Sequence, residues 1–219
     1  MRGVLMVMMM CLPLLAGACA PEQPAVDIPV DGYVLVWSDE FDGTELDAQK
    51  WRPRRLGRRR NAINVTDTIA LDGQGHLVLT TRQNGDVYET AMMGTDETFL
   101  TTYGYFECRA KLQTQVGHWS AFWIQSHAID QELDNTEVTG TEIDVYEYLI
   151  NFGDDVVHNL HWNGYAEHHK TVGGRATVPG LSEGWHTLAC IGPRKATSST
   201  STVRRPGART KPSPNTPNT

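Results

Sequence analysis

Short runs of strand-forming residues, separated by turn residues, fill the chain from Val34 to Ile191. Val, Thr, Tyr and Trp recur in runs roughly ten residues apart, which is typical of sandwiches and barrels, and long helical periodicity is absent. Asp72-Gly73 and Asn84-Gly85 mark tight reversals between neighbouring strands. The pattern predicts an all-β protein of two antiparallel sheets, because one sheet alone could not bury this many aromatic residues.

Length and charge narrow the possible partners. The chain has 219 residues, 40% of them hydrophobic, which is enough for one domain with a sizeable core and too short for two of ordinary size. The net charge is −7, and because residues 193–219 carry six basic residues and no acid, residues 1–192 carry −13. A body of this charge does not attract nucleic acid, so we expect no nucleic-acid partner.

One segment departs from this acidic balance. Residues 51–61, "WRPRRLGRRRN", hold six arginines within nine positions. A solvated loop is one interpretation, and a surface that faces an anionic polysaccharide is the other. The sequence leaves both open.

The first residues have the features of an export signal. Arg2 precedes an apolar run from Val4 to Leu15, which is too short to span a bilayer. The following "LAGAC" resembles a bacterial lipobox, so we expect removal of residues 1–18 and a lipid anchor to the membrane at Cys19, with plain cleavage after residue 18 as the alternative. Residues 19–32 then form a linker. The expected location is the cell envelope, periplasmic or on the outer surface, or the medium if Cys19 carries no lipid.

Two cysteines remain after the signal and the lipobox. Cys108 and Cys190 could form a disulfide, and export would permit one. Two cysteines define no framework, however, and sequence alone does not place the thiols near each other.

Three carboxylates crowd one strand-like run, "GTEIDVYEY". Each ionised group raises the cost of ionising the next. Strict alternation puts Glu142 and Asp144 on one face of a strand and Glu147 on the other. One extra residue, a β-bulge at Val145 or Tyr146, would return Glu147 to the face of the other two.

Acids gathered on one face suit the hydrolysis of glycosidic bonds. One ionised carboxylate attacks the anomeric centre, while a second, still protonated near neutral pH, donates to the leaving oxygen. Carboxyl groups about 5 to 5.5 Å apart imply retention of the anomeric configuration, and a wider separation implies inversion. The sequence does not give this separation. A calcium site, which also gathers oxygen ligands, and an exposed acidic strand are the alternatives.

Alternation also assigns faces in two neighbouring runs. In "HWSAFWIQS", Trp119 and Trp123 share one side, whereas Phe122 points to the other side and suits a core. The two tryptophans could line a sugar groove, because indole stacks on the apolar faces of sugar rings and carries a polar N–H. The alternative is that all three aromatic residues are core. In "VVHNLHWNG", Asn159 and His161 share a face.

The run "EIDVYE" is similar to the Glu-Ile-Asp-x-x-Glu signature of glycoside hydrolase family 16, the group that includes laminarinases, agarases and carrageenases. Four other runs resemble family motifs and keep the family's order from about Val34 to Ala189. These runs are "WSDEFDGTELDAQKW", "YGYFECRAKL", "GHWSAFWIQS" and "HNLHWNGY".

The resemblance implies a concanavalin A-like jelly-roll β-sandwich with a sugar groove across one sheet, and hydrolysis with retention. By motif position, Glu142 is the nucleophile, Glu147 is the general acid and then the base, and Asp144 is the auxiliary acid that orients the nucleophile. The residues expected to bind the substrate are Trp119, Trp123 and His161.

The chain departs from the family's pattern after the "GWHTLAC" run. It contains no aromatic residue beyond Trp185, so we expect residues 193–219 to be a disordered tail without strands. Permissible codons for residues 191–200, read in another frame, give Trp-Thr-Pro-Glu-Gly-Tyr-Ile-Phe-Tyr, which is similar to the missing family segment. We therefore expect an out-of-frame tail and a sandwich that is incomplete at its C-terminus, so that residues 33–192 form a partial catalytic domain.

The sequence thus predicts an endo-glycosidase that acts on a polysaccharide, with β-1,3-glucan as the default substrate that the family suggests. No cofactor or metal is expected, because a calcium ion that often binds the family's convex face would lose a ligand from the missing final strand. Two rival functions remain. One is a carbohydrate-binding jelly roll without turnover, and the other is an inactive truncated fragment.

Overall fold

The computed structural model describes residues 30–131, 134–192 and 201–204. The expected export signal, Cys19 and most of the linker and tail lie outside these residues. The chain divides into two compact units, residues 1–36 and 37–219. Of the first unit, residues 30–36 form a turn followed by irregular chain, and the second unit contains every strand and helix given below.

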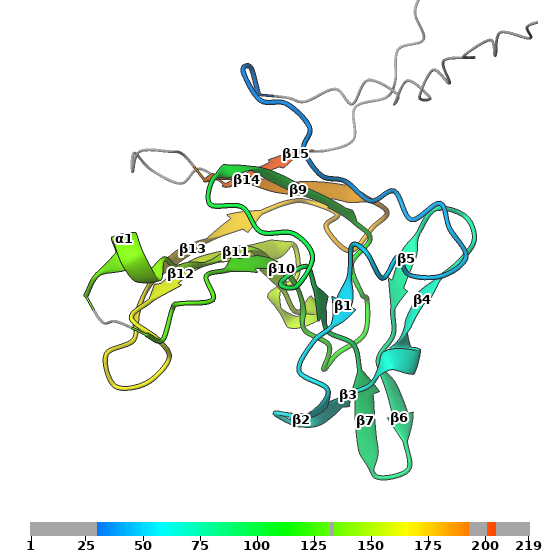
Figure 1. The fold of residues 1–219 in the computed structure, drawn as a ribbon. Coiled ribbons are helices and arrows are strands. Elements are labelled where there is room, and N and C mark those ends of the chain that lie inside the picture. The colour runs from blue at the N-terminus through cyan, green and yellow to red at the C-terminus, as the bar shows by residue number, and fades with distance from the viewer. Residues whose placement is uncertain (1–29, 132–133, 193–200, 205–219) are drawn as a thin grey trace, which may run out of the picture. The chain divides into compact units, whose positions relative to one another are not determined.

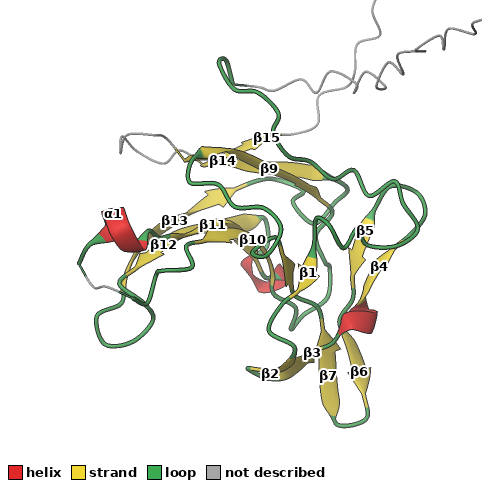
Figure 2. Cartoon of the chain, in the orientation of Figure 1, coloured by secondary structure: helices red, strands yellow, loops and turns green. Residues whose placement is uncertain are grey.

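Strands make up nearly all the regular structure of the second unit, as Figures 1 and 2 show, and the all-β prediction is confirmed. The strands are β1 (Arg52–Pro53), β2 (Gly57–Arg59), β3 (Ala62–Asn64), β4 (Ile69–Leu71), β5 (Leu77–Leu79), β6 (Arg82–Asn84), β7 (Val87–Thr90), β8 (Met93–Gly94), β9 (Gly104–Ala110), β10 (Ser120–Gln125), β11 (Glu142–Tyr148), β12 (Asp155–Trp162), β13 (Lys170–Thr177), β14 (His186–Gly192) and β15 (Ser201–Arg204). The helical elements are α1 (Thr136–Thr139) and two 3-10 turns, Thr66–Thr68 and Ile150–Phe152. Within the described part of the chain, no helix has the length and apolar character needed to cross a bilayer.

Two antiparallel sheets form the main layers. One has the strand order β10-β11-β12-β13, and the other has the order β15-β14-β9 (Figure 1). Side chains from both layers meet in one core, in which Tyr148 of β11, Val156 of β12 and Leu188 of β14 are fully buried. This packing confirms the predicted sandwich of two antiparallel sheets.

The N-terminal strands add smaller sheets that the sequence did not predict. β2, β3, β7 and β6 form a four-stranded sheet, and the pairs β1-β8 and β4-β5 form two-stranded ones. β3 and β7 are parallel, which differs from the expected purely antiparallel pattern. A parallel pair needs a long connection, and here the connection runs through β4, β5 and β6.

The expectation that no strand forms beyond residue 192 is wrong at residues 201–204. These residues form β15 and pair in antiparallel register with Thr187–Cys190 of β14. Thr202 and Val203 have high strand propensity, and the pairing occupies hydrogen-bonding groups on an edge of β14 that would otherwise face solvent.

Both cysteines of the second unit are free. Cys108 of β9 lies opposite Leu188 of β14, whereas Cys190 of β14 lies opposite Phe106, so the thiols belong to neighbouring strands but not to one pair. Burial raises the pKa of each thiol to about 11. Both groups are therefore protonated and unreactive near neutral pH.

Candidate active site

β11 contains the bulge that the sequence predicts. Asp144 pairs with Trp123 of β10, and Tyr146 pairs with the next residue, Phe122, so Val145 is the extra residue. On the other side, Val145 and Tyr146 together lie opposite a single residue of β12. An extra residue shifts the alternation of a strand by one position, and the prediction of a bulge at this point is confirmed.

The shift brings Glu147 to the side of the other two acids. Residues paired across antiparallel strands point to the same side of a sheet, and alternate residues of β10 share one side. The pairs that define this side are Glu142 with Gln125, Asp144 with Trp123, and Glu147 with Ala121. We call this side of the β10–β13 sheet the acid face.

His158 of β12 holds the bulge in place. Its Nδ1 lies 2.6 Å from the carbonyl oxygen of Val145. Burial lowers the pKa of His158, so the ring is neutral near pH 7 and the Nδ1–H donates to that carbonyl. Nε2 is then the unprotonated nitrogen, and among the described residues this buried atom has no hydrogen-bond partner.

Two donors orient the carboxylate of Glu142. Gln125 Nε2 donates to Glu142 Oε2 across 2.7 Å, and the hydroxyl of Tyr165 donates to the same oxygen across 2.5 Å. Gln125 also donates to the Tyr165 oxygen, which links all three side chains. Burial and the contact with Glu142 raise the pKa of Tyr165, so the hydroxyl keeps its proton and continues to donate.

Asp144 lies between the two glutamates along β11 and is only 5% exposed. Burial raises the pKa of its carboxyl group to about 7, and the negative charges of Glu147 and Glu142 contribute to the increase. The sequence predicts that crowding keeps one acid protonated near neutral pH. The structure assigns this effect to Asp144.

A chain of hydrogen bonds leads from Asp144 to the protein surface. Asp144 Oδ2 lies 3.1 Å from His161 Nε2, and His161 Nδ1 lies 2.9 Å from Nε2 of the exposed His169. When Asp144 is protonated, its O–H donates to His161, whose Nδ1–H donates in turn to His169. His161 thus lies beside the acids, as expected, while its contact with substrate stays a prediction.

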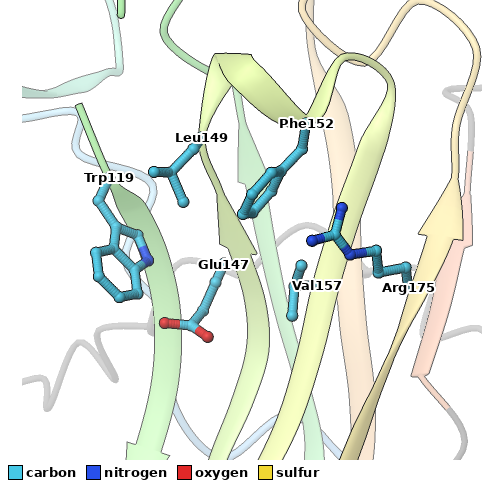
Figure 3. A pocket seen from close by; sticks show the side chains of 6 residues that line it. All are labelled: Trp119, Glu147, Leu149, Phe152, Val157 and Arg175. Carbon is cyan, nitrogen blue, oxygen red and sulfur yellow. The ribbon is translucent and has the colours of Figure 1, made fainter. Parts of the chain in front are cut away.

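Glu147 borders a cavity of about 290 Å³, close to the lower size of small-molecule sites, which is about 300 Å³. The side chains around it are Trp119, Glu147, Leu149, Phe152, Val157 and Arg175. Figure 3 shows the carboxyl group of Glu147 with Trp119 on one side and Val157 and Arg175 on the other. Asn159 Nδ2 donates to Glu147 Oε2 across 2.6 Å and fixes the carboxyl group at the cavity wall.

Both predicted groove tryptophans lie at the acid face. Trp119 immediately precedes β10 and is 51% exposed, so the alternative that every aromatic residue in this run is core is wrong. The guanidinium carbon of Arg60 lies 5.0 Å from the centre of the Trp119 ring, and that of Arg54 lies 5.1 Å from the Trp123 ring. These are cation–π distances. Phe122 packs against the core, as predicted.

One group of donor atoms in the described residues is close enough to hold a metal ion. It consists of Glu142, Asp144 and His161, whose ligand atoms lie within 4.8 Å of one another. Calcium takes six to eight oxygen ligands, whereas this set includes a nitrogen, and Asp144 and His161 are already hydrogen-bonded to each other. The donors do not fit the calcium alternative, and the expectation of no metal stays a prediction.

Four residues of the site were not identified from the sequence: Gln125, His158, Tyr165 and His169. Extending the alternation of β10 by one step beyond Trp123 would have found Gln125. Tyr165 and His169 come from the connection between β12 and β13, where no periodicity gives the position of a side chain. His158 shows no signal, because its role depends on the bulge in the neighbouring strand.

The fold and the acid face together define a class of protein. It is the β-sandwich that carries three carboxylates on one bulged strand, beside a cavity walled by aromatic residues. The chain belongs to glycosyl hydrolases family 16, because the family model matches residues 57–191, more than half of the chain. The family resemblance seen in the sequence and the jelly-roll fold that it implies are both confirmed.

Three individual similarities agree with this assignment. A β-glucanase of Rhodothermus marinus is 33% identical over 173 residues, which are 72% of this chain and 58% of that protein. A structure reported for endo-acting O-glycanases that human gut microbiota express to initiate mucin breakdown is 26% identical, with a TM-score of 0.67 over 82% of this chain and 71% of that one. The laminarinase of Flavobacterium sp. UMI-01 is 25% identical, with a TM-score of 0.61 over 81% and 80%. The chain thus spans less than two thirds of the length of the Rhodothermus enzyme.

Proposed function

We propose that this chain is a glycoside hydrolase that cleaves β-glycosidic bonds within a polysaccharide, with β-1,3-glucan as its default substrate. The observation that carries the proposal is the bulge in β11, which puts Glu147 on the same face as Glu142 beside a cavity with an aromatic wall. The substrate class comes from the relatives, which are a β-glucanase and a laminarinase.

The first step forms a covalent intermediate. The oriented carboxylate of Glu142 attacks the anomeric carbon, and the bond from that carbon to the leaving oxygen breaks. Glu147 donates its proton to the leaving oxygen. Because Asn159 binds Oε2 of Glu147, we assign the proton transfer to Oε1. Trp119 stacks on a sugar ring in the cavity and holds it against Glu147.

The second step releases the sugar. Glu147 takes a proton from a water molecule, the water oxygen attacks the anomeric carbon, and the bond to Glu142 breaks. The product keeps the configuration of the substrate. Asp144, which is protonated near neutral pH, limits the negative charge on the acid face, and when it ionises its proton can leave through His161 and His169 to solvent.

The proposal is tested by the release of reducing sugar from laminarin, lichenan, agarose, carrageenan and porphyran. We expect hydrolysis of laminarin by the wild-type chain and a loss of about 10³-fold or more in Glu142→Gln, because removing the nucleophile leaves only binding and proton transfer. Glu45→Gln, which changes an exposed acid outside the β10–β13 sheet, is the matched control and should keep full activity. An unchanged rate in Glu142→Gln would remove Glu142 from the mechanism.

The same experiment separates the rival functions. A chain that binds polysaccharide and releases no reducing sugar would be a carbohydrate-binding jelly roll. A chain that lacks a cooperative unfolding transition would be an inactive fragment.

We also propose that the protein is exported and anchored in the cell envelope by lipid on Cys19. The support is the sequence of the first residues, with an apolar run followed by "LAGAC". Growth with labelled palmitate should label the wild-type protein and not Cys19→Ser. Equal labelling of both proteins would reject the anchor.

A further inference from the structure

The arginine-rich segment lies against the acid face. Two of its six arginines pair with acids, Arg52 with Glu97 at 3.7 Å and Arg54 with Asp96 at 3.2 Å. The other four, Arg55, Arg58, Arg59 and Arg60, form no ion pair with any carboxylate among the described residues, and all four are exposed. The segment therefore carries an excess of positive charge that the described protein does not neutralise.

The β2–β3 hairpin carries part of this charge to the tryptophans. Arg59 pairs with Ala62, so Arg60 and Asn61 form the two-residue turn. Arg60 has a φ of 54°, a left-handed conformation in which Gly or Asn costs less than Arg. From this turn, the Arg60 guanidinium lies over Trp119, and Arg54 lies over Trp123. These contacts contradict the interpretation of residues 51–61 as a freely solvated loop.

Arg59 connects this charge to the catalytic carboxylates. Arg59 is exposed, but partial desolvation of its guanidinium and the positive charges of Arg60, Arg55 and Arg54 lower its pKa, and Glu142 opposes that effect. The guanidinium stays protonated all the same. Arg59 is thus repelled by three neighbouring guanidinium groups and attracted by Glu142. Their mutual repulsion is unfavourable unless anions join them.

We propose that Arg59 and Arg60, which we call the basic rim, bind acidic substituents of the polysaccharide, namely sulfate esters or uronate carboxylates. A guanidinium group presents paired N–H donors that match either anion. A sugar bound at Trp119 would place such a substituent beside Arg60, which lies over the same ring. The basic rim would also offset the repulsion between an acidic polysaccharide and the three carboxylates of the acid face. This inference rests on the proposed function, because both use the acid face, and it replaces the neutral glucan with an anionic β-glycan as the preferred substrate.

Three forms of one polysaccharide test the basic rim. The probes are laminarin, laminarin bearing sulfate esters, and laminarin oxidised to carboxylate at its primary hydroxyl groups, each assayed for KM and for Kd in 0.15 M salt, which screens long-range attraction. We expect the wild-type chain to bind at least one acidic form about tenfold or more tightly than laminarin, as one charge-assisted contact worth about 1.4 kcal/mol would give. The two acidic forms show whether sulfate or carboxylate is preferred.

Arg59→Gln and Arg58→Gln form a matched pair of variants. Both remove one positive charge from β2, but neighbouring residues of a strand point to opposite sides. We expect Arg59→Gln to reduce the preference for the acidic form about tenfold and Arg58→Gln to preserve it. Equal losses in both variants, or equal affinity of the wild-type chain for all three probes, would overturn the proposal.

The outcome also distinguishes the two proposals. Selective binding of an acidic form, lost in Arg59→Gln and without cleavage of any probe, would support the basic rim and reject the hydrolase. Cleavage of laminarin with no preference for acidic forms would reject anion binding by the basic rim, and the proposed hydrolase function would stand.

Discussion

Replacing Asp144 with Asn is expected to stabilise the fold and to slow hydrolysis. Asn has the shape of the protonated acid, and its amide N–H can donate to His161 Nε2 as the carboxyl O–H of Asp144 does. Asn cannot ionise. The variant therefore avoids the unfavourable interactions that burial and the two glutamates impose on an ionised Asp144.

The size of the effect follows from the pKa of Asp144. The carboxyl group has a pKa of about 7 in the fold against an ordinary value of 3.8. At 1.36 kcal/mol per pKa unit, this difference corresponds to roughly 4 kcal/mol. We expect the free energy of unfolding to rise by roughly 2 to 4 kcal/mol in the variant, because a weaker hydrogen bond from the amide to His161 would offset part of the gain.

The sign of the pH dependence is fixed by linkage. A folded state that raises the pKa of an acid binds the proton more tightly than the unfolded chain does, so wild-type stability falls as pH rises from 3.8 to about 7 and then stays level. Below pH 3.8 both states hold the proton and the variant has no advantage. The advantage of Asp144→Asn should therefore grow through this window and remain above it.

Urea unfolding, followed by circular dichroism at pH 4 and pH 8.5, measures this difference. Asp86→Asn is the control, since Asp86 lies exposed in the turn between β6 and β7, and it should give the same difference from wild type at both pH values. If Asp144→Asn is no more stable than wild type at pH 8.5, or if its advantage is equally large at pH 4, the argument from crowded carboxylates is refuted. The rate on laminarin should fall about tenfold or more, because Asp144 can no longer take or release a proton.

Three other variants test separate parts of the site. Trp119→Ala should raise KM for laminarin about tenfold with little change in kcat, since stacking contributes about 1 kcal/mol beyond buried area, and an equal fall in kcat would argue against a binding role. His158→Phe should lower the free energy of unfolding by roughly 1 to 3 kcal/mol at pH 8, because the carbonyl of Val145 loses its donor; a fully stable variant would show that the bulge does not need this bond. Because the pKa of His158 is lowered in the fold, wild-type stability should also fall as pH drops through about 6.5, the ordinary His value, and His158→Phe should lack that contribution. His169→Ala should change the pH profile of kcat and leave KM unchanged if the hydrogen-bond chain carries a proton, whereas an unaltered profile would assign His169 a purely structural role.

The bulge could be predicted from sequence because strict period-two alternation does not put all three acids on one face of the strand. Glu142 and Asp144 are two residues apart, Glu147 is three further on, and one extra residue is the smallest change that puts all three on one face. The same counting placed Trp119 with Trp123, and Asn159 with His161, on common sides of their strands. Period-two alternation thus predicts side-chain direction within a regular strand and locates the point at which the strand becomes irregular.

Tertiary contacts decided what the sequence left open. The arginine-rich segment fitted both a solvated loop and a surface for an anion, and only the cation–π contacts of Arg54 and Arg60 distinguish them. Tyr165 and His169 reach the site from a connection whose path has no periodic signal. The proton held near pH 7 was assigned to Asp144 only when its burial became known, since spacing gives the presence of repulsion but not the degree of desolvation.

The configuration of the first product tests the central claim most directly. If Glu142 and Glu147 act as nucleophile and acid–base on one face of β11, proton NMR of freshly started laminarin hydrolysis should show the β-anomer first, with the α-anomer growing later by mutarotation. First appearance of the α-anomer would mean inversion by a single displacement. It would contradict a covalent intermediate on Glu142.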